Sequence, residues 1–157
     1  MIVKTRQSIF VAGLLLMCAA VAFASPNFSG EWKMNATKSD FGQMPPPTSV
    51  VQKITHEDPS LRVARTWTGD QGEMTDDFTF TTDGKECANK SPMGEMKSTL
   101  KWDGDALVSE TKADFQGNAA AITSRWTLSE DGKTLTEKAH FSSSMGEGDM
   151  TMIYDKQ

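Results

Sequence analysis

The sequence predicts an all-β fold: a single antiparallel up-and-down β-barrel of about eight to ten strands. Three observations support this. Turn signals recur throughout residues 25–157, the segments between them alternate apolar and polar residues, and no window shows the apolar stripe of a long helix. Successive turns are about ten to fifteen residues apart, which is typical of consecutive hairpins.

The N-terminus has the pattern of an export signal. Lys4 and Arg6 precede a nearly apolar run over residues 8–23, and Ala22-Phe23-Ala24 supplies a small-x-small cleavage pattern. We therefore expect residues 1–24 to be a signal peptide. The run is short for a membrane span and no second one follows, so no span is expected after its removal.

The remaining residues, 25–157, are expected to form one domain. Cys18 follows Leu16-Met17 rather than the small residue that precedes a lipidated cysteine, so lipidation is the minority interpretation. Cys87 alone is left after cleavage and can form no internal disulfide. An exported domain without disulfides favours a bacterial periplasmic or secreted protein.

Composition excludes several other classes. The 157 residues contain 38% hydrophobic residues, too many for a disordered chain. They include 16 Lys and Arg against 21 Asp and Glu, with no basic stripe that would bind phosphates. A nucleic-acid partner is therefore not expected.

The predicted turns are rich in Gly, Asp, Asn and Pro, which favour turn geometry. In chain order they are Asp58-Pro59, Gly69-Asp70-Gln71-Gly72, Asp83-Gly84, Pro92-Met93-Gly94, Asp103-Gly104, Gln116-Gly117-Asn118, Asp131-Gly132 and Gly146-Glu147-Gly148. Residues 36–48 contain Pro45-Pro46-Pro47 and are predicted to form a loop, with a helical turn near Lys38-Ser39-Asp40.

Between the turns, side chains of one parity are expected to face the interior. These sets are Phe28, Trp32 and Met34; Val63 and Trp67 in 61–68; Met74, Phe78 and Phe80 in 73–81; Leu100 and Trp102 in 95–102; Ile122, Trp126 and Leu128 in 119–128; Leu135, Ala139 and Phe141 in 133–142; and Met150, Met152 and Tyr154. Residues 105–115 are the best helical rival, and three alanines weaken the strand at 119–128.

Sequential antiparallel strands leave exposed edges unless the sheet closes, so a barrel is expected. A barrel of this size can hold one small ligand. The inward Trp, Phe and Met side chains suit an apolar pocket, and equally suit a filled core. Arg65 shares the inward parity, where it would pair with Asp76 or hold an anionic ligand.

No catalytic constellation is present in the sequence. His56 and His140 have no nucleophile motif nearby and are expected on the surface. Asp76 and Asp77 point to opposite strand faces and cannot act as a pair. Scattered Met and His residues give little support for a metal site, no cofactor is expected, and Cys87 is expected to be a small buried residue.

Phe28-Ser29-Gly30-Glu31-Trp32-Lys33 resembles the Phe-x-Gly-x-Trp opening of the calycins, the lipocalins and fatty-acid-binding proteins, whose Trp closes one barrel end. The segment from Met150 to Lys156 resembles the last strand of the fatty-acid-binding proteins. The resemblance implies that Trp32 closes the barrel. Arg125 could likewise resemble the lipocalin arginine over that Trp, although its parity places it outside or at the barrel end.

One departure concerns the ligand. Fatty-acid-binding proteins carry Arg-x-Tyr on the final strand, and here Tyr154 keeps the Tyr position whereas Met152 takes the Arg position. The resemblance therefore does not imply fatty-acid binding in that family's manner. Residues 36–48 also lack room for the two helices of that family, so this loop would have to be the lid.

The expected function is an exported, non-enzymatic protein that binds a small apolar or amphipathic ligand in a barrel lumen. The residues expected to line it are Arg65, Trp67, Phe78, Phe80, Trp102 and Tyr154. One alternative is a periplasmic protein-binding module or enzyme inhibitor on a filled barrel, contacting its partner through loop 36–48. A third hypothesis is an enzyme such as an isomerase, for which no residue stands out.

Overall fold

The computed structural model describes residues 25–70, 72–92, 94–115 and 117–157, and these contain ten β-strands and no helix. The strands are β1 (Gly30–Met34), β2 (Ser49–Glu57), β3 (Ser60–Gly69), β4 (Gly72–Thr81), β5 (Asp83–Ser91), β6 (Gly94–Asp103), β7 (Ala106–Phe115), β8 (Asn118–Leu128), β9 (Thr134–Ser143) and β10 (Gly146–Lys156). The predicted signal peptide lies outside the described residues. No helix long and apolar enough to span a membrane occurs within them.

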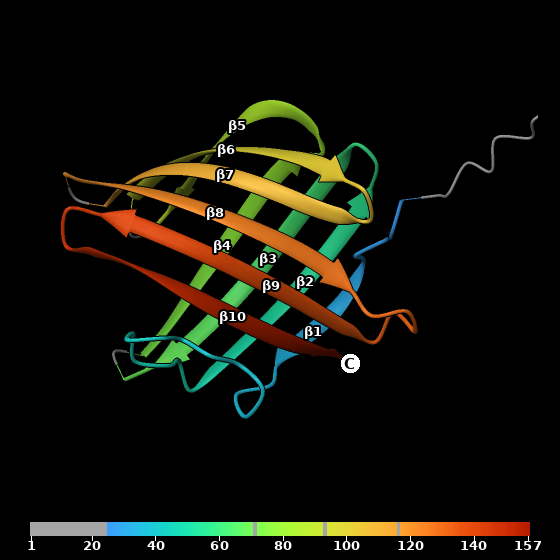
Figure 1. Ribbon diagram of the computed structural model, residues 1–157, viewed down its shortest axis with the longest axis horizontal. Helices are drawn as coiled ribbons and strands as arrows, with labels where there is room; N and C mark the ends of the chain where they lie inside the picture. The colour runs from blue at the N-terminus through green and yellow to red at the C-terminus, as the bar shows by residue number, and fades with distance from the viewer. Residues whose placement is uncertain (1–24, 71, 93, 116) are drawn as a thin grey trace, which may run out of the picture.

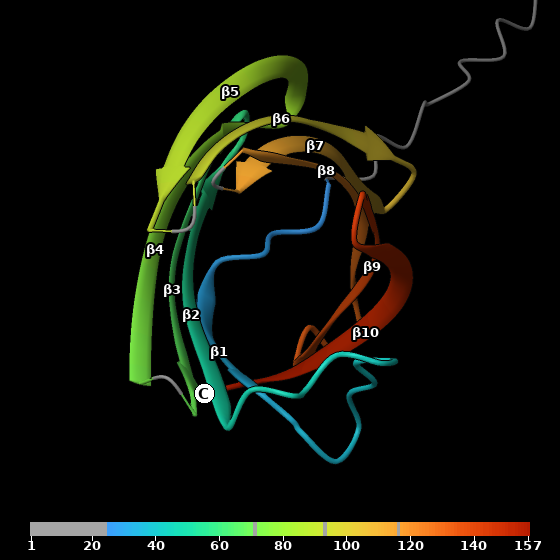
Figure 2. The same cartoon turned by 90° about the vertical axis from the view of Figure 1, so that its left-hand side faces the viewer.

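The strands form one antiparallel sheet in the order β4-β3-β2-β1-β10-β9-β8-β7-β6-β5. Every pair of strands that are consecutive in the chain shares a backbone ladder, except β4 and β5. In addition, β1 pairs with β10, so the first and last strands are neighbours. The sheet curls until its two edges meet, giving the ring of strands visible in Figure 2. The predicted up-and-down barrel is confirmed, and the helical rival over 105–115 is strand β7.

A side chain joins the two edges of the sheet. The Asn89 amide oxygen accepts a hydrogen bond from the Thr79 backbone N–H at 2.9 Å, and its NH₂ donates to the Thr79 carbonyl at 3.1 Å. The amide therefore gives β4 the two hydrogen bonds that a neighbouring strand would supply. The barrel is nearly closed by this contact.

Of the five predicted turns that lie wholly within the described residues, Asp58-Pro59, Asp103-Gly104 and Asp131-Gly132 are confirmed and two are displaced. Each of the other three includes a residue outside the described ones. Gly146 pairs with Ser143, so the last hairpin turns at Ser144-Met145 and the predicted Gly146-Glu147-Gly148 turn lies inside β10. Asp83-Gly84 likewise lies inside β5, because Thr82 alone connects β4 to β5. Thr82 is held in place by its N–H, which donates to the Pro59 carbonyl at 2.9 Å.

The two ends of the barrel differ (Figure 1). The turns after β2, β4, β6 and β8 meet at one end, on the right of the figure, where the segment before β1 crosses the ring. The C-terminal ends of β3, β5 and β7, the turn after β9 and the loop between β1 and β2 lie at the opposite end. We call these the closed end and the mouth.

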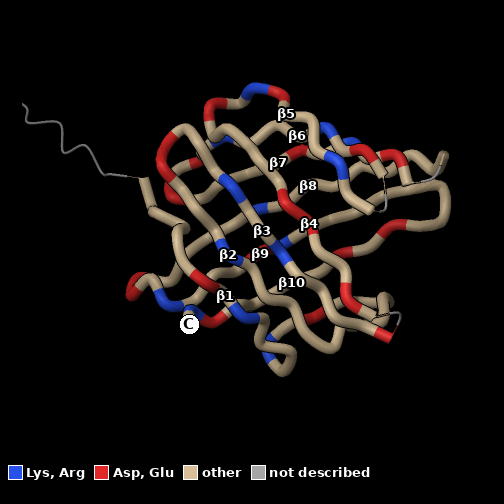
Figure 3. The backbone as a smooth tube through the Cα atoms, turned by 180° about the vertical axis from the view of Figure 1, so that it is seen from behind, with Lys and Arg blue, Asp and Glu red and all other residues tan. Residues whose placement is uncertain are grey.

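Positively and negatively charged residues are interspersed along β1–β4 (Figure 3). Most charged residues are exposed, whereas Arg65, Asp76 and Glu137 line the interior. Cross-strand pairs such as Arg62 with Asp77 and Lys53 with Glu31 hold the exposed ones in place. These exposed pairs contribute little to stability. Asp77 points outward while its neighbour Asp76 is buried, as the strand parity predicts.

Candidate functional site

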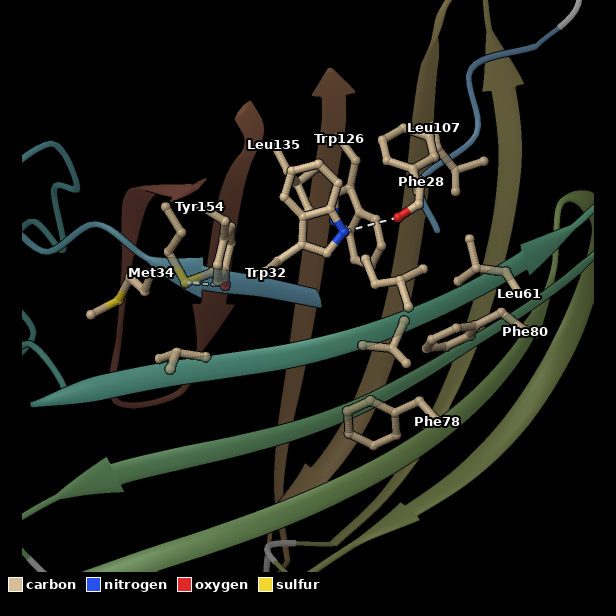
Figure 4. Packing of buried hydrophobic residues seen from close by; sticks show 14 of the residues in the cluster. Phe28, Trp32, Met34, Leu61, Phe78, Phe80, Leu107, Trp126, Leu135 and Tyr154 are labelled. Atoms are coloured by element: carbon tan, nitrogen blue, oxygen red, sulfur yellow. Dashed lines mark hydrogen bonds between the residues drawn. The ribbon is translucent and has the colours of Figure 1, made fainter. Parts of the chain in front are cut away.

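The closed end is filled by packed aromatic and aliphatic side chains. Phe28, Trp32, Leu61, Leu107 and Leu135 are fully buried there. The indole N–H of Trp32 donates to the Phe28 carbonyl at 2.9 Å, which ties the N-terminal segment across the barrel (Figure 4). This end offers a solid floor and no space for a ligand.

Polar groups at the closed end satisfy one another. His56 is buried, contrary to the surface position that we predicted. It occupies one of the inward positions that alternate along β2, and its ring hydrogen-bonds two groups there. Its Nδ1 accepts from the Phe28 N–H at 3.2 Å, so Nε2 carries the proton and donates to Asp58 at 2.9 Å. His140, in contrast, is exposed as expected.

Asp58 is the centre of this network. Its Oδ1 also accepts from the Thr82 hydroxyl at 2.6 Å and from the Trp102 indole N–H at 3.4 Å. Burial opposes its ionisation, but the hydrogen bonds from Thr82 and His56 outweigh burial and lower the pKa of Asp58. Trp102 therefore serves the closed end, where it stacks on Phe28 with ring centres 6.0 Å apart.

Between this floor and the mouth the barrel is hollow. A cavity of about 350 Å³ is lined mainly by apolar side chains, and its volume lies within the range of small-molecule sites. Four of the six side chains predicted to line the lumen are on its wall, namely Arg65, Trp67, Phe78 and Phe80. The filled core that we considered as the alternative is not present.

The other predicted residues lie elsewhere. Trp102 is at the closed end, and Tyr154 is fully buried in the hydrophobic core, where its hydroxyl donates to the Met152 sulfur at 3.3 Å. Arg125 lies outside the barrel and pairs with Asp103 rather than covering Trp32. The cation over the Trp32 ring is Lys156, whose Nζ is 5.1 Å from the ring centre, because the last strand pairs directly with β1.

One wall of the cavity is aromatic. Trp67 on β3 and Phe78 and Phe80 on β4 face the lumen, and the two Phe rings lie 5.9 Å apart. The Arg65 guanidinium lies among them, 4.7 Å from the Trp67 ring centre and 5.4 Å from that of Phe78. Its predicted partner is confirmed: Arg65 Nη2 is 3.7 Å from Asp76 Oδ2, and both side chains are largely buried.

The opposite wall carries hydroxyl groups that sequence reasoning missed. Ser98 on β6 bonds Thr111 on β7 at 2.8 Å, and Ser109 on β7 bonds Ser124 on β8 at 2.7 Å. All four line the cavity. We call Ser98, Ser109, Thr111 and Ser124 the hydroxyl wall. The signal was available, because each occupies an inward position of its strand.

Glu137 on β9 was also missed. It lies between Leu135 and Ala139 in the inward parity and is only 7% exposed. Burial raises the pKa of Glu137, and the charge of Arg65, which is the largest opposing influence, only partly offsets this effect. Burial, reinforced by the Glu137 charge, also raises the pKa of Tyr154.

The mouth is partly covered by the loop over residues 35–48. Asp40 exchanges two backbone hydrogen bonds with Thr151 on β10, at 2.7 and 2.8 Å. Phe41, Met44, Pro45 and Pro47 then line the cavity. The predicted helical turn is a hydrogen-bonded turn over 35–39, after which Asp40 forms a single bridge to β10 and the chain turns again over 42–44.

Gly42 allows this close approach. Its φ is +58°, and a Cβ at this position would lie 2.8 Å from the Asp149 carbonyl oxygen. The loop therefore lies where a lid would be required, as the sequence predicts. Whether it also contacts a protein partner stays a prediction.

Other chemistry is sparse in the part of the chain that the structure describes. No group of three or more His, Cys, Asp or Glu side chains there is arranged to hold a metal ion. Cys87 is half-buried on β5, with its sulfur 3.6 Å from the Thr81 hydroxyl.

Comparison with known proteins gives structural matches only. No family model and no curated protein matches the chain. A zebrafish ileal bile acid-binding protein complexed with cholic acid is 16% identical, with a TM-score of 0.56, and the match covers 83% of this chain and 98% of that one.

Two further structures are equally similar. The fluorescent protein UnaG is 17% identical with a TM-score of 0.58, over 83% of this chain and 97% of its own. A secretory abundant heat soluble protein from Ramazzottius varieornatus is 14% identical with a TM-score of 0.58, over 85% and 98%. At such identities the likeness concerns the fold. The chain has the ten-stranded barrel fold of the fatty-acid-binding-protein-like calycins, as the resemblance in the sequence implies.

Proposed function

We propose that this protein is an exported, non-enzymatic binding protein that holds one small apolar or amphipathic ligand inside its barrel. The observation that carries the proposal is the hollow interior, a cavity of about 350 Å³ bounded by a packed floor and a loop across the mouth. A ten-stranded barrel has no need to stay hollow for stability, because filling a cavity generally stabilises a core.

The chemistry of the walls supports an amphipathic occupant. Trp67, Phe78 and Phe80 offer a broad apolar surface, which favours burial of an apolar ligand. The hydroxyl wall opposite can accept and donate hydrogen bonds. A zebrafish protein of the same fold carries cholic acid, which is consistent with a small-molecule role for the interior.

Export is part of the proposal and is supported by the sequence. The basic residues Lys4 and Arg6, the apolar run over 8–23 and the Ala22-Phe23-Ala24 pattern precede the barrel directly. A periplasmic or secreted location follows if that segment is cleaved. Mass measurement of the protein isolated from its own host would test this, since an intact residue 1–24 segment would contradict it.

Filling the cavity tests the binding function. Ala139 lines the cavity, whereas its neighbour Lys138 points outward from the same strand. We expect Ala139→Phe to weaken binding of the neutral apolar dye Nile red by about tenfold or more, because the new ring occupies ligand space. Lys138→Phe should leave the affinity unchanged. Equal affinities in the two variants, or no dye binding to the native protein, would reject the proposal.

A further inference from the structure

We propose that the cavity is selective for uncharged amphiphiles with hydroxyl or carbonyl groups and discriminates against carboxylates. This inference rests on the proposed binding function and specifies the class of ligand. It is drawn from the charges and the unpaired polar atoms that face the cavity.

The first step concerns positive charge. Among the described residues that line the cavity, Arg65 carries the only cationic side chain. Its charge is already engaged, since Asp76 lies 3.7 Å away and the rings of Trp67 and Phe78 flank the guanidinium. A ligand carboxylate would therefore have to compete with Asp76 for this one cation.

The second step concerns negative charge. Asp76 and Glu137 both line the cavity and are 8% and 7% exposed, so the wall carries two carboxyl groups against one guanidinium. With Glu137 protonated the wall is neutral, and with Glu137 ionised it is negative. Neither state provides a counter-charge for an anion, and burying an unpaired carboxylate is strongly unfavourable.

The third step concerns atoms without partners. Arg65 Nε, Trp126 Nε1 and Glu137 Oε2 are buried and make no hydrogen bond within the described structure. Buried polar atoms are normally paired, and these three belong to side chains that line the cavity, so they are the candidates to bind a polar group of a ligand. The first two are donors, and they would suit a hydroxyl or carbonyl oxygen.

The hydroxyl wall extends this preference. In each pair, Ser98 with Thr111 and Ser109 with Ser124, one hydroxyl donates to the other, so one proton per pair is left for another acceptor. Neutral polar groups on one face of a ligand can bind here while its apolar face lies on Phe78. The cavity is thus two-faced and overall lacks a free charge.

The test compares three ligands that share an alkyl chain and differ in the charge of the head group: decanol, decanoate and decylamine. Displacement of Nile red from the native protein at neutral pH should require at least about tenfold less decanol than either ion. Decanoate binding as tightly as decanol would overturn the inference, and so would a preference for decylamine, which would identify Glu137 as an ionised counter-charge. Failure of Nile red and of all three ligands to bind would instead reject the proposed function.

Matched variants locate the selectivity. Asp76→Asn removes the partner of Arg65 and should tighten decanoate binding by about tenfold while decanol changes little. Asp77→Asn removes the neighbouring carboxylate, which pairs with Arg62 outside the barrel, and should change neither affinity. An unchanged decanoate affinity in Asp76→Asn would overturn the inference. If that variant does not fold, the ligand ratio of the native protein decides alone.

Discussion

The closed end and the cavity wall are both formed by inward-facing side chains of the barrel strands, but they differ in how their polar groups are hydrogen-bonded. At the closed end the side chains of His56 and Asp58 are hydrogen-bonded to each other, to the Phe28 N–H and to the Thr82 hydroxyl. The aromatic rings around them fill the space. Along the cavity Arg65, Trp126 and Glu137 each keep a buried polar atom without a partner.

This difference separates stability from function. A packed floor contributes to folding, whereas unpaired buried atoms reduce stability unless something else binds them. The closed end therefore carries the stability of the barrel, and the cavity wall is available for recognition. Substitutions in the two regions should have correspondingly different effects.

The largest expected difference is between two tryptophans. Trp32 is fully buried at the closed end, whereas Trp67 borders the hollow cavity and is half-buried. Trp32→Ala should lower the free energy of unfolding by about 3–5 kcal/mol, because it removes a large packed ring and leaves a void. Trp67→Ala should cost about half as much or less, because its ring is packed on fewer sides.

Denaturant unfolding of both variants measures this difference. Equal losses would mean that the cavity wall supports the fold as strongly as the floor, contrary to the comparison. Trp67→Ala should in addition weaken Nile red binding, which Trp32→Ala should not do directly if the variant remains folded.

The second difference is between the two histidines. His56 accepts from the Phe28 N–H and donates to Asp58 inside the closed end. His140 lies on the surface, where its ring is hydrogen-bonded to the exposed carboxylate of Asp149. His56→Ala should cost about 1–3 kcal/mol, since it leaves the buried Phe28 N–H without an acceptor and removes one donor to Asp58. His140→Ala should change the stability by about 0.5 kcal/mol or less.

Thermal and denaturant unfolding at neutral pH would measure both histidine variants. A similar loss in the two would show that the His56 contacts do not anchor the N-terminal segment.

Parity along each strand was sufficient to predict the barrel and most of its inward apolar residues, because a period of two assigns every side chain to a face. Met74, predicted inward, is an exception and is 43% exposed. It was insufficient to place those residues along the barrel axis. Trp102 and Tyr154 share the inward parity with Phe78, but Trp102 lies in the floor and Tyr154 in the packed core rather than on the cavity wall. The depth of a side chain depends on the register and the tilt of the strands.

Polar residues were harder to predict than apolar ones. Glu137, His56 and Ser124 occupy inward positions, but such residue types are usually exposed, and their burial depends on partners far away in sequence. The Phe28 N–H that holds His56 is an example. Arg65 was correctly paired with Asp76 because the two lie on adjacent strands of one hairpin.

The smallest expected effect concerns Glu137 and depends on pH. Burial raises the pKa of Glu137 above its value in the unfolded chain, while Arg65 and Tyr154, which face it from β3 and β10, modulate the shift. A carboxyl whose pKa is raised by folding costs no stability below the unfolded pKa. The cost appears as pH rises from that value towards the folded pKa.

Glu137→Gln removes this cost and keeps the shape, so the variant should gain unfolding free energy relative to the native protein at pH 7 but not at pH 4. Because all other titrating groups are common to both proteins, the difference between their unfolding curves isolates Glu137. A difference that is the same at both pH values would show that the carboxyl is not held in its protonated form by the fold. The cavity would then carry an ionised acid, and the expected preference for uncharged ligands would shift towards cations.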